Sequence, residues 1–189
     1  MTATLALTLH NQGNLEEAVL YFQQAWVGKQ KTLGVDHQRT LITLHELALT
    51  LRKQGNLAEA ADYFQQAWEG KQRTLGADHQ STLVTLHSLA LTLRKQGKLT
   101  EAATYFQQAW VGKQKTLSPD HNSTLLSLSE LAYTLEHQNK LQQALDHYQQ
   151  VLELETGALG VDHESTQITA QAITRVHEKQ LKQQRDEFN

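Results

Sequence analysis

The dipeptide Asp-His returns at a constant interval along the chain, and this interval limits the fold more than any other feature. It occurs at residues 36, 78, 120 and 162, so each step is 42 residues. The first two complete blocks, residues 36–77 and 78–119, differ at only ten of their 42 positions. A period of this length is typical of architectures in which each copy is one supersecondary unit. The chain is therefore predicted to be a tandem array.

Each copy is predicted to form two helices. The first carries an apolar stripe at three- and four-residue steps, made by Leu41, Leu44, Leu47, Ala48 and Leu51. The second begins near Leu57 and ends near Leu75-Gly76, and its inner face consists of Ala60, Ala61, Phe64, Ala67 and Trp68. No segment alternates in the way a strand does, so the fold class is all-α.

Turn residues separate these helices at the same place in every copy. Gly55 follows a lysine in the last turn of the first helix, as a left-handed C-cap does, and Gly13, Gly97 and Asn139 hold the equivalent positions. Each Asp-His pair, together with the polar residues and the threonine that follow it, is expected to supply side-chain caps for the next helix. These threonines are Thr40, Thr82, Thr124 and Thr166.

One such hairpin cannot bury both of its faces, so the copies are expected to stack around a shared core. The prediction is a single right-handed superhelical α-solenoid over residues 1–189. Its parts are a shortened repeat 1–35, the repeats 36–77, 78–119 and 120–161, and a C-terminal capping helix within 162–189. The first copy lacks most of its first helix, so an apolar face is expected to be exposed at that end and to support self-association.

The core positions of the hairpin resemble the tetratricopeptide (TPR) repeat. Leu44, Leu47-Ala48, Leu51, Ala60, Phe64 and Ala67 have its order and spacing. The 42-residue period and the segment 67–79 are similar to TPRs of the kinesin-light-chain type. The Glu-Gly form of that segment, Glu69-Gly70, is most similar to the arrays of fungal NLR-like (STAND) signalling proteins. This resemblance implies a non-catalytic scaffold for protein–protein interaction.

Several family features of ligand binding are missing from the chain. The proline usual after Asp-His is replaced by Gln38, Gln80, Asn122 or Glu164. The Asn-Asn pair of kinesin-type repeats is replaced by His45-Glu46, His87-Ser88 and Ser129-Glu130. The asparagine with which clamp-type TPRs hold a carboxylate is replaced by Leu49, Leu91 and Tyr133. Neither kinesin-like cargo binding nor a carboxylate clamp is therefore implied.

The resemblance places the candidate peptide-binding groove on the first helices, beside their core stripe. It predicts a pair of histidines, an aliphatic-to-aromatic strip, a basic edge and an extension onto the last helix. We expect a protein or peptide ligand that combines apolar anchors with acidic residues. The predicted groove residues are His45, Leu49, Arg52, Lys53, His87, Leu91, Arg94, Lys95, Ser129, Tyr133 and Arg175. In the simpler alternative, near-identical copies repeat a solvated basic face.

Two further positions recur without an assigned function. Trp26, Trp68 and Trp110 form a ladder that becomes Leu152 in the fourth copy, which favours a bulky packing residue over an aromatic platform. Gly28, Gly70 and Gly112 lie inside the second helices, where glycine costs about 1 kcal/mol relative to alanine. We expect a close approach or a bend at this position.

Composition excludes several classes of function. The chain has no cysteine, which removes thiolate chemistry and fits a reducing compartment, so we expect a cytoplasmic location. No helical His-x-x-x-His pair, phosphate-binding loop or Ser/His/Asp set is present, so no metal, no cofactor and no enzyme activity are predicted. No apolar run is long enough to cross a membrane. Exposed histidines at positions 45 and 87 would titrate near neutral pH.

The preferred function is therefore a scaffold that binds a partner along the concave face, as the ligand-sensing or partner-recruiting array of a larger cytosolic signalling protein. One alternative is a structural or self-assembling repeat module, natural or engineered. A second is nucleic-acid binding through Arg52-Lys53 and Arg94-Lys95. The net charge of −3 and the lack of stacking aromatics on that face argue against nucleic acid.

Overall fold

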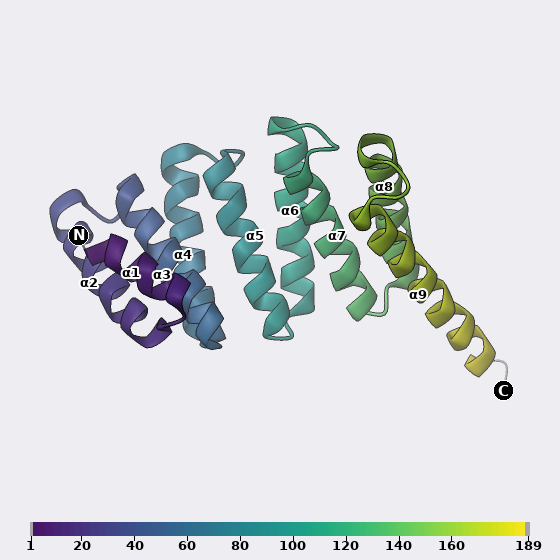
Figure 1. Ribbon diagram of the computed structural model, residues 1–189, viewed down its shortest axis with the longest axis horizontal. Coiled ribbons are helices and arrows are strands. Elements are labelled where there is room, and N and C mark those ends of the chain that lie inside the picture. The colour runs from purple at the N-terminus through teal and green to yellow at the C-terminus, as the bar shows by residue number, and fades with distance from the viewer. Residues whose placement is uncertain (1, 188–189) are drawn as a thin grey trace. The chain divides into compact units, whose positions relative to one another are not determined.

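A computed structural model describes residues 2–187 and contains only helices and connecting turns within that range. The elements are drawn in Figure 1. They are α1 (Thr2–Gln12), α2 (Leu15–Leu33), α3 (Gln38–Gln54), α4 (Leu57–Leu75), α5 (Gln80–Lys95), α6 (Leu99–Thr116), α7 (Asn122–His137), α8 (Leu141–Leu159) and α9 (Glu164–Glu187). The all-α prediction and the division of each copy into two helices are confirmed.

The helices group into two compact units, Met1–Lys98 and Leu99–Asn189. The first holds α1 to α5 and the second holds α6 to α9. Within each unit every helix packs mainly against the helices next to it in the chain, as expected for stacked hairpins (Figure 1). The boundary falls inside the repeat 78–119, between its two helices. The joining of all repeats into one solenoid stays a prediction.

Each first helix after a connector is capped by the histidine of the Asp-His pair. The Nδ1 atom of His37 accepts a hydrogen bond from the backbone N–H of Arg39 at 3.1 Å, and His79, His121 and His163 do the same for Ser81, Ser123 and Ser165. This bond satisfies one of the backbone donors left free at a helix start. Thr40 takes no part in this cap, because it is buried within the helix and its Oγ1 donates to the Gly34 carbonyl at 2.9 Å. The predicted capping by the Asp-His segment is therefore confirmed at the histidine and is wrong at the threonine.

The predicted left-handed turns are present between the two helices of each hairpin. Gly13, Gly55 and Gly97 have φ angles of 86°, 92° and 80°, and Asn139 has a φ of 61°. The backbone N–H of Gly55 donates to the Arg52 carbonyl at 3.2 Å, which closes the end of α3. This turn brings each second helix back along the first.

The core is the one the sequence predicts. Ala48, Ala60, Phe64 and Ala67 are 0% exposed, because small residues let the helices approach and phenylalanine fills the remaining space. The tryptophan ladder is also structural: Trp26 of α2 contacts Tyr63 of α4 edge-on, with ring centroids 5.4 Å apart. Trp110 of α6 likewise contacts His147 of α8, with ring centroids 5.9 Å apart, so these two tryptophans pack against the next second helix.

The recurring glycine within the second helices has a different environment in two copies. A Cβ atom added at Gly70 of α4 would lie 2.5 Å from Leu41 Cδ2, and Leu41 is itself buried. The same addition at Gly28 of α2 would meet no atom within 4 Å. The expected close approach is therefore found at Gly70 and not at Gly28.

Candidate protein-binding surface

The first helices of unit Met1–Lys98 leave two aliphatic rows open to solvent. Ile42 and Val84 form one row and are 43% and 41% exposed. Leu49 and Leu91 are half-buried and lie seven residues, or about two helical turns, after them. Lys53 and Lys95 follow one turn later and are exposed. An apolar strip with a basic edge therefore lies on α3 and α5.

The unit Leu99–Asn189 repeats this arrangement with different residues. Leu126 and Ile168 lie at the repeat position of Ile42 and Val84 and are 50% and 58% exposed. Tyr133 replaces the leucine of the second row and is 39% exposed. Its ring centroid lies 4.2 Å from that of His137, whose Nδ1 is 2.8 Å from the Tyr133 carbonyl. Aliphatic and aromatic surface is thus available on α7 and α9.

The two histidines predicted for the groove are buried, so this part of the prediction is wrong. His45 and His87 are each 8% exposed. The Nδ1 of His45 lies 3.1 Å from Thr85 Oγ1, and its ring contacts Phe64 edge-on with centroids 5.2 Å apart. Burial, together with the nearby Lys71 and Arg52 cations, lowers the pKa of His45 to about 3. His45 is a neutral core residue and does not titrate near neutrality.

The hydroxyl of Thr85 determines which tautomer His45 adopts. Thr85 Oγ1 donates to the Ser81 carbonyl at 2.9 Å, so it can only accept from its other partners. One of these is Lys71 Nζ at 2.8 Å, and the other is His45. The Nδ1 of His45 therefore carries its proton and donates.

Buried lysines at this position were not singled out from the sequence. Lys71 and Lys113 are each 4% exposed, and Lys113 Nζ donates to Ser127 Oγ at 2.8 Å and to the Ser123 carbonyl at 3.0 Å. Burial lowers the pKa of each lysine to about 8, and Glu46 partly opposes this at Lys71. Each lysine lies 14 residues before the hydroxyl it contacts, and this repeated Lys…Ser/Thr spacing is the signal that could have revealed the pair.

The basic edge of the groove consists of lysines and not arginines. Arg52 is half-buried, its guanidinium carbon lies 5.6 Å from the centroid of the Phe64 ring, and Nη1 donates to the Ser88 carbonyl at 3.3 Å. Arg94 is half-buried as well. Lys53 and Lys95 are the exposed cations, and Lys53 Nζ donates to the His10 carbonyl at 3.2 Å.

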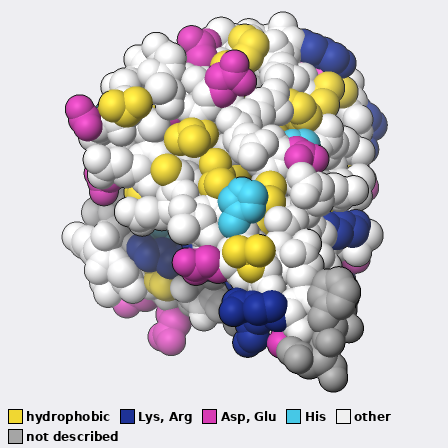
Figure 2. All heavy atoms as spheres, turned by 90° about the vertical axis from the view of Figure 1, so that its right-hand side faces the viewer, with side chains coloured by type: hydrophobic (Ala, Val, Ile, Leu, Met, Phe, Trp, Pro, Cys, Tyr) yellow, Lys and Arg dark blue, Asp and Glu magenta, His cyan; other side chains and the backbone are white. Residues whose placement is uncertain are grey.

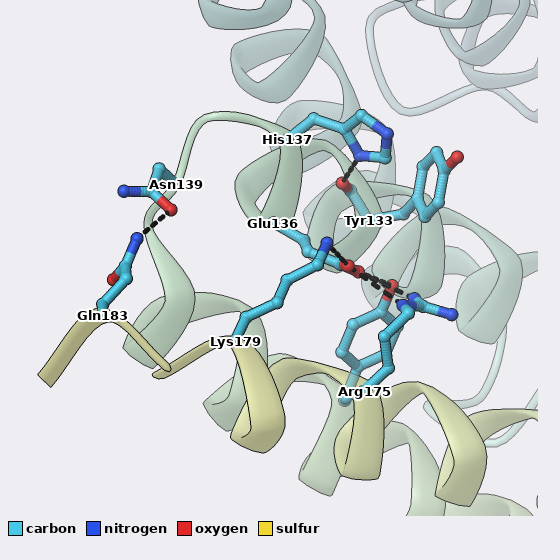
Figure 3. Close-up of polar contacts among 8 residues, drawn as sticks. Tyr133, Glu136, His137, Asn139, Arg175, Lys179 and Gln183 are labelled. Carbon is cyan, nitrogen blue, oxygen red and sulfur yellow. Dashed lines mark hydrogen bonds and ion pairs between the residues drawn. The ribbon is translucent and has the colours of Figure 1, made fainter. Parts of the chain in front are cut away.

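Two predicted groove residues of the second unit make contacts within the fold. Ser129 Oγ donates to the Leu125 carbonyl of its own helix at 3.0 Å. Arg175 donates through Nε and Nη2 to the two carboxylate oxygens of Glu136, at 3.0 and 2.7 Å (Figure 3). The charge of Arg175 is therefore compensated by a residue of α7.

Sequence reasoning missed the aliphatic row of each unit, Ile42 and Val84 in the first and Leu126 and Ile168 in the second. Each member lies seven residues before Leu49, Leu91, Tyr133 or Arg175, so the row is visible as an apolar position off the core stripe in every copy. On the face of α8 and α9, viewed in Figure 2, hydrophobic side chains form small separate groups among polar and backbone atoms.

Neither a metal-binding cluster nor a membrane-spanning helix occurs within residues 2–187. No cluster of three or more His, Asp or Glu side chains is placed to hold a metal ion there. No helix of that range is long and apolar enough to span a bilayer.

Comparison with known proteins assigns the family. Sequence models described as tetratricopeptide repeat match residues 1–73, 82–123 and 124–165. No curated protein sequence matches the chain.

Solved structures of similar fold include the nearly identical TPR-like repeats of a kinesin light chain candidate from Podosopora anserina and a single-residue variant of the same protein. Each has 28% sequence identity and a TM-score of 0.87, over 97% of this chain and 87% of the other. BtubC (BKLC) from P. vanneervenii has the same fold at 14% identity and a TM-score of 0.78, over 84% of this chain and 63% of the other. The chain belongs to the tetratricopeptide repeat family, a family of non-catalytic helical scaffolds that mediate protein–protein interaction.

Proposed function

We propose that the first-helix face of residues 1–98 binds a segment of a partner protein. The two aliphatic rows would hold apolar side chains of the segment, and acidic residues would lie against Lys53 and Lys95. The observation that carries this proposal is the exposure of Ile42 and Val84 on neighbouring first helices beside these lysines. Apolar residues grouped on one face and bordered by charge are typical of interaction sites.

The equivalent face of α7 and α9 offers a second stretch of contact. Leu126, Ile168 and Tyr133 supply apolar and aromatic surface there. Aromatic residues are frequent among those that dominate binding energy at protein interfaces. A partner segment could therefore use either unit, and the two units are testable separately.

The resemblance of Glu69-Gly70 and its surroundings to fungal NLR-like arrays supports a cellular context for this binding. In that context the chain would sense a ligand or recruit a partner as part of a larger cytosolic signalling protein. This context rests on resemblance, whereas the binding face rests on exposure and charge.

The test uses a peptide selected from a displayed library against the full chain. The double variant Ile42→Ser with Val84→Ser removes one aliphatic row, and its affinity for the selected peptide is measured by fluorescence polarisation. We expect a loss of at least about tenfold, since two apolar anchors each contribute about 1 kcal/mol or more. The control, Asp62→Ser, changes an exposed residue of α4. Unchanged affinity in the double variant would reject this face as the site.

A second candidate function, self-association, is favoured by the exposure of α1. Leu5 is 45% exposed, whereas Leu47, its equivalent in α3, is 0% exposed. Sedimentation velocity over a hundredfold range of concentration tests this candidate. An assembly that Leu5→Ser dissolves would support it, and a monomer at every concentration would remove it.

A further inference from the structure

The residues of α7 and α8 that contact α9 carry charges opposite to those at the equivalent positions of the earlier hairpins. Glu136 of α7 lies at the repeat position that holds Arg52 in α3 and Arg94 in α5. Glu155 of α8 lies at the repeat position that holds Lys71 in α4 and Lys113 in α6. Among these hairpins, a carboxylate replaces the cation at both positions only in the hairpin of α7 and α8, on which α9 packs.

Glu136 is enclosed by partners from two helices. Its side chain is 1% exposed, yet it accepts two hydrogen bonds from Arg175 and one from Lys179 of α9 (Figure 3). Tyr148 Oη of α8 also donates to it, at 3.4 Å. Burial alone would raise the pKa of Glu136, but the hydrogen bonds from Arg175 and Lys179 outweigh it and hold the pKa at about 2. The carboxylate is therefore charged and fully paired.

The residue at the repeat position of Tyr148 differs from the first unit as well. The equivalent residue in α4 is Phe64, whose ring lies under the Arg52 guanidinium. A phenyl ring accepts a cation over its face, while a phenol donates to a carboxylate. The Arg–Phe contact of the first unit is thus replaced by a Glu–Tyr contact in the second.

The hydrogen bond of Glu155 to α9 runs in the opposite direction to the equivalent bond of the first unit. In the first unit Lys71 donates to Thr85 of α5 at 2.8 Å. In the second unit the equivalent Thr169 of α9 donates to Glu155 Oε2 at 2.7 Å. Glu155 is 7% exposed, so its partner cannot be replaced by bulk water without cost.

We propose that Glu136, supported by Tyr148, forms a charge code that accepts α9 and rejects the other first helices of the chain from this position. Glu155 does not contribute to this choice, because α3, α5 and α7 also carry Thr or Ser at the position of Thr169. Arg175 replaces Leu49 and Leu91 of α3 and α5, so neither of those helices would offer Glu136 a guanidinium. In the other direction, α9 packed onto α3 and α4 would bring the Arg175 guanidinium against that of Arg52, where α5 offers Leu91.

Such a charge code would help to fix the register in which the repeats stack. Two repeats differ at only ten of 42 positions, so an array shifted by one repeat would bury nearly the same apolar surface. Apolar packing therefore discriminates poorly between registers. Breaking a buried ion pair or placing like charges together is costly, and this cost separates the correct register from the shifted one.

The experiment measures hydrogen exchange of α9 amides by mass spectrometry in full-length variants. Arg175→Lys keeps the charge, and Arg175→Met keeps a similar length without it. We expect exchange within about threefold of the parent in the lysine variant and at least tenfold faster in the methionine variant, with amides of α1 to α4 unchanged in both. Equal protection of α9 in the two variants would overturn the proposal, because packing alone would then hold the helix.

A cycle of variants then tests whether the code is transferable. Glu136→Arg alone is expected to speed exchange in α9 further, because three cations would meet. Adding Tyr148→Phe and Arg175→Leu reproduces the residues of the first unit, since Lys179 already matches Lys95. We expect this triple variant to recover most of the lost protection. Effects that simply add, with no recovery, would refute a matched code. Lys95→Gln in α5 is the control and should leave α9 unchanged.

Discussion

His45 lies in the interior of the first unit in its neutral form, held by Thr85 and Phe64. A histidine that recurs on a helix beside the core stripe would ordinarily be solvent-exposed, and our prediction placed it in the groove. The burial of both His45 and His87 shows that the accessible stripe of the first helices runs through Ile42, Leu49 and Lys53 instead.

The burial of His45 predicts a dependence of stability on pH. Its pKa is about 3 in the folded chain against an ordinary value of 6.5, so below pH 6.5 only the unfolded chain takes up the proton. The contribution of His45 to stability is thus complete above pH 6.5 and falls between pH 6.5 and 3, by up to about 1.4 kcal/mol per pH unit. Urea unfolding at pH 7, 5 and 4 measures this. His45→Gln, which can still donate to Thr85, should show a shallower decline; an identical decline would contradict the assignment.

The two glycines at one repeat position give a matched pair of substitutions. Gly28→Ala adds a methyl group in open space, so the gain in helix propensity should stabilise the chain by about 0.5–1 kcal/mol. Gly70→Ala places its methyl group against the buried Leu41, and we expect a net destabilisation of about 1 kcal/mol. Thermal unfolding of both variants decides the matter. The same shift in both would show that the contact with Leu41 relaxes freely.

At the scale of elements, the Asp-His motif acts through a cap made by its histidine, one of several residues of this segment that the sequence offered as caps. The histidine ring accepts the N-terminal backbone bond, and the aspartate lies outside it: Asp36 pairs with Arg73 at 2.7 Å. Asp and Thr are the commoner capping residues, so residue preference alone did not single out the histidine. The helix bounds themselves followed from periodicity and glycine positions.

Removing one histidine cap should destabilise the helix that it begins. His79→Ala deletes the acceptor for the Ser81 N–H and is expected to lower the free energy of unfolding by about 1 kcal/mol. His79→Asn supplies another side-chain acceptor and should lose less than half of that amount. Urea unfolding compares the two variants with the parent. Equal stability of the alanine variant and the parent would mean that the cap bond contributes nothing.

At the scale of the whole molecule, the small net charge of −3 conceals a local excess of cations on the first-helix face of residues 1–98. Lys53 and Lys95 are exposed there, whereas Lys71 and Arg52 are withdrawn into contacts within the fold. The proposed partner is therefore attracted mainly by these two lysines, and its affinity should depend moderately on salt.

Reversing these lysines tests that electrostatic contribution. The double variant Lys53→Glu with Lys95→Glu should weaken binding of an acidic, apolar-anchored peptide by at least about tenfold at 0.05 M salt. The difference from the parent should shrink at 0.5 M salt because mobile ions screen exposed charges. Calorimetry at both salt concentrations measures it. A loss independent of salt would point to disturbed packing and not to charge, and circular dichroism checks the fold.

The sequence by itself determined the repeat, the two helices of each copy, the left-handed turns and the alanine and phenylalanine core. These features depend on spacing within one hairpin, where the helical period places residues directly. Only the tertiary structure decided which off-core residues stay accessible and which polar groups are buried. Such contacts join residues such as Lys71 and Thr85, or Glu136 and Arg175, which belong to different helices. Their meeting depends on the packing of one hairpin on the next, which a local pattern does not specify.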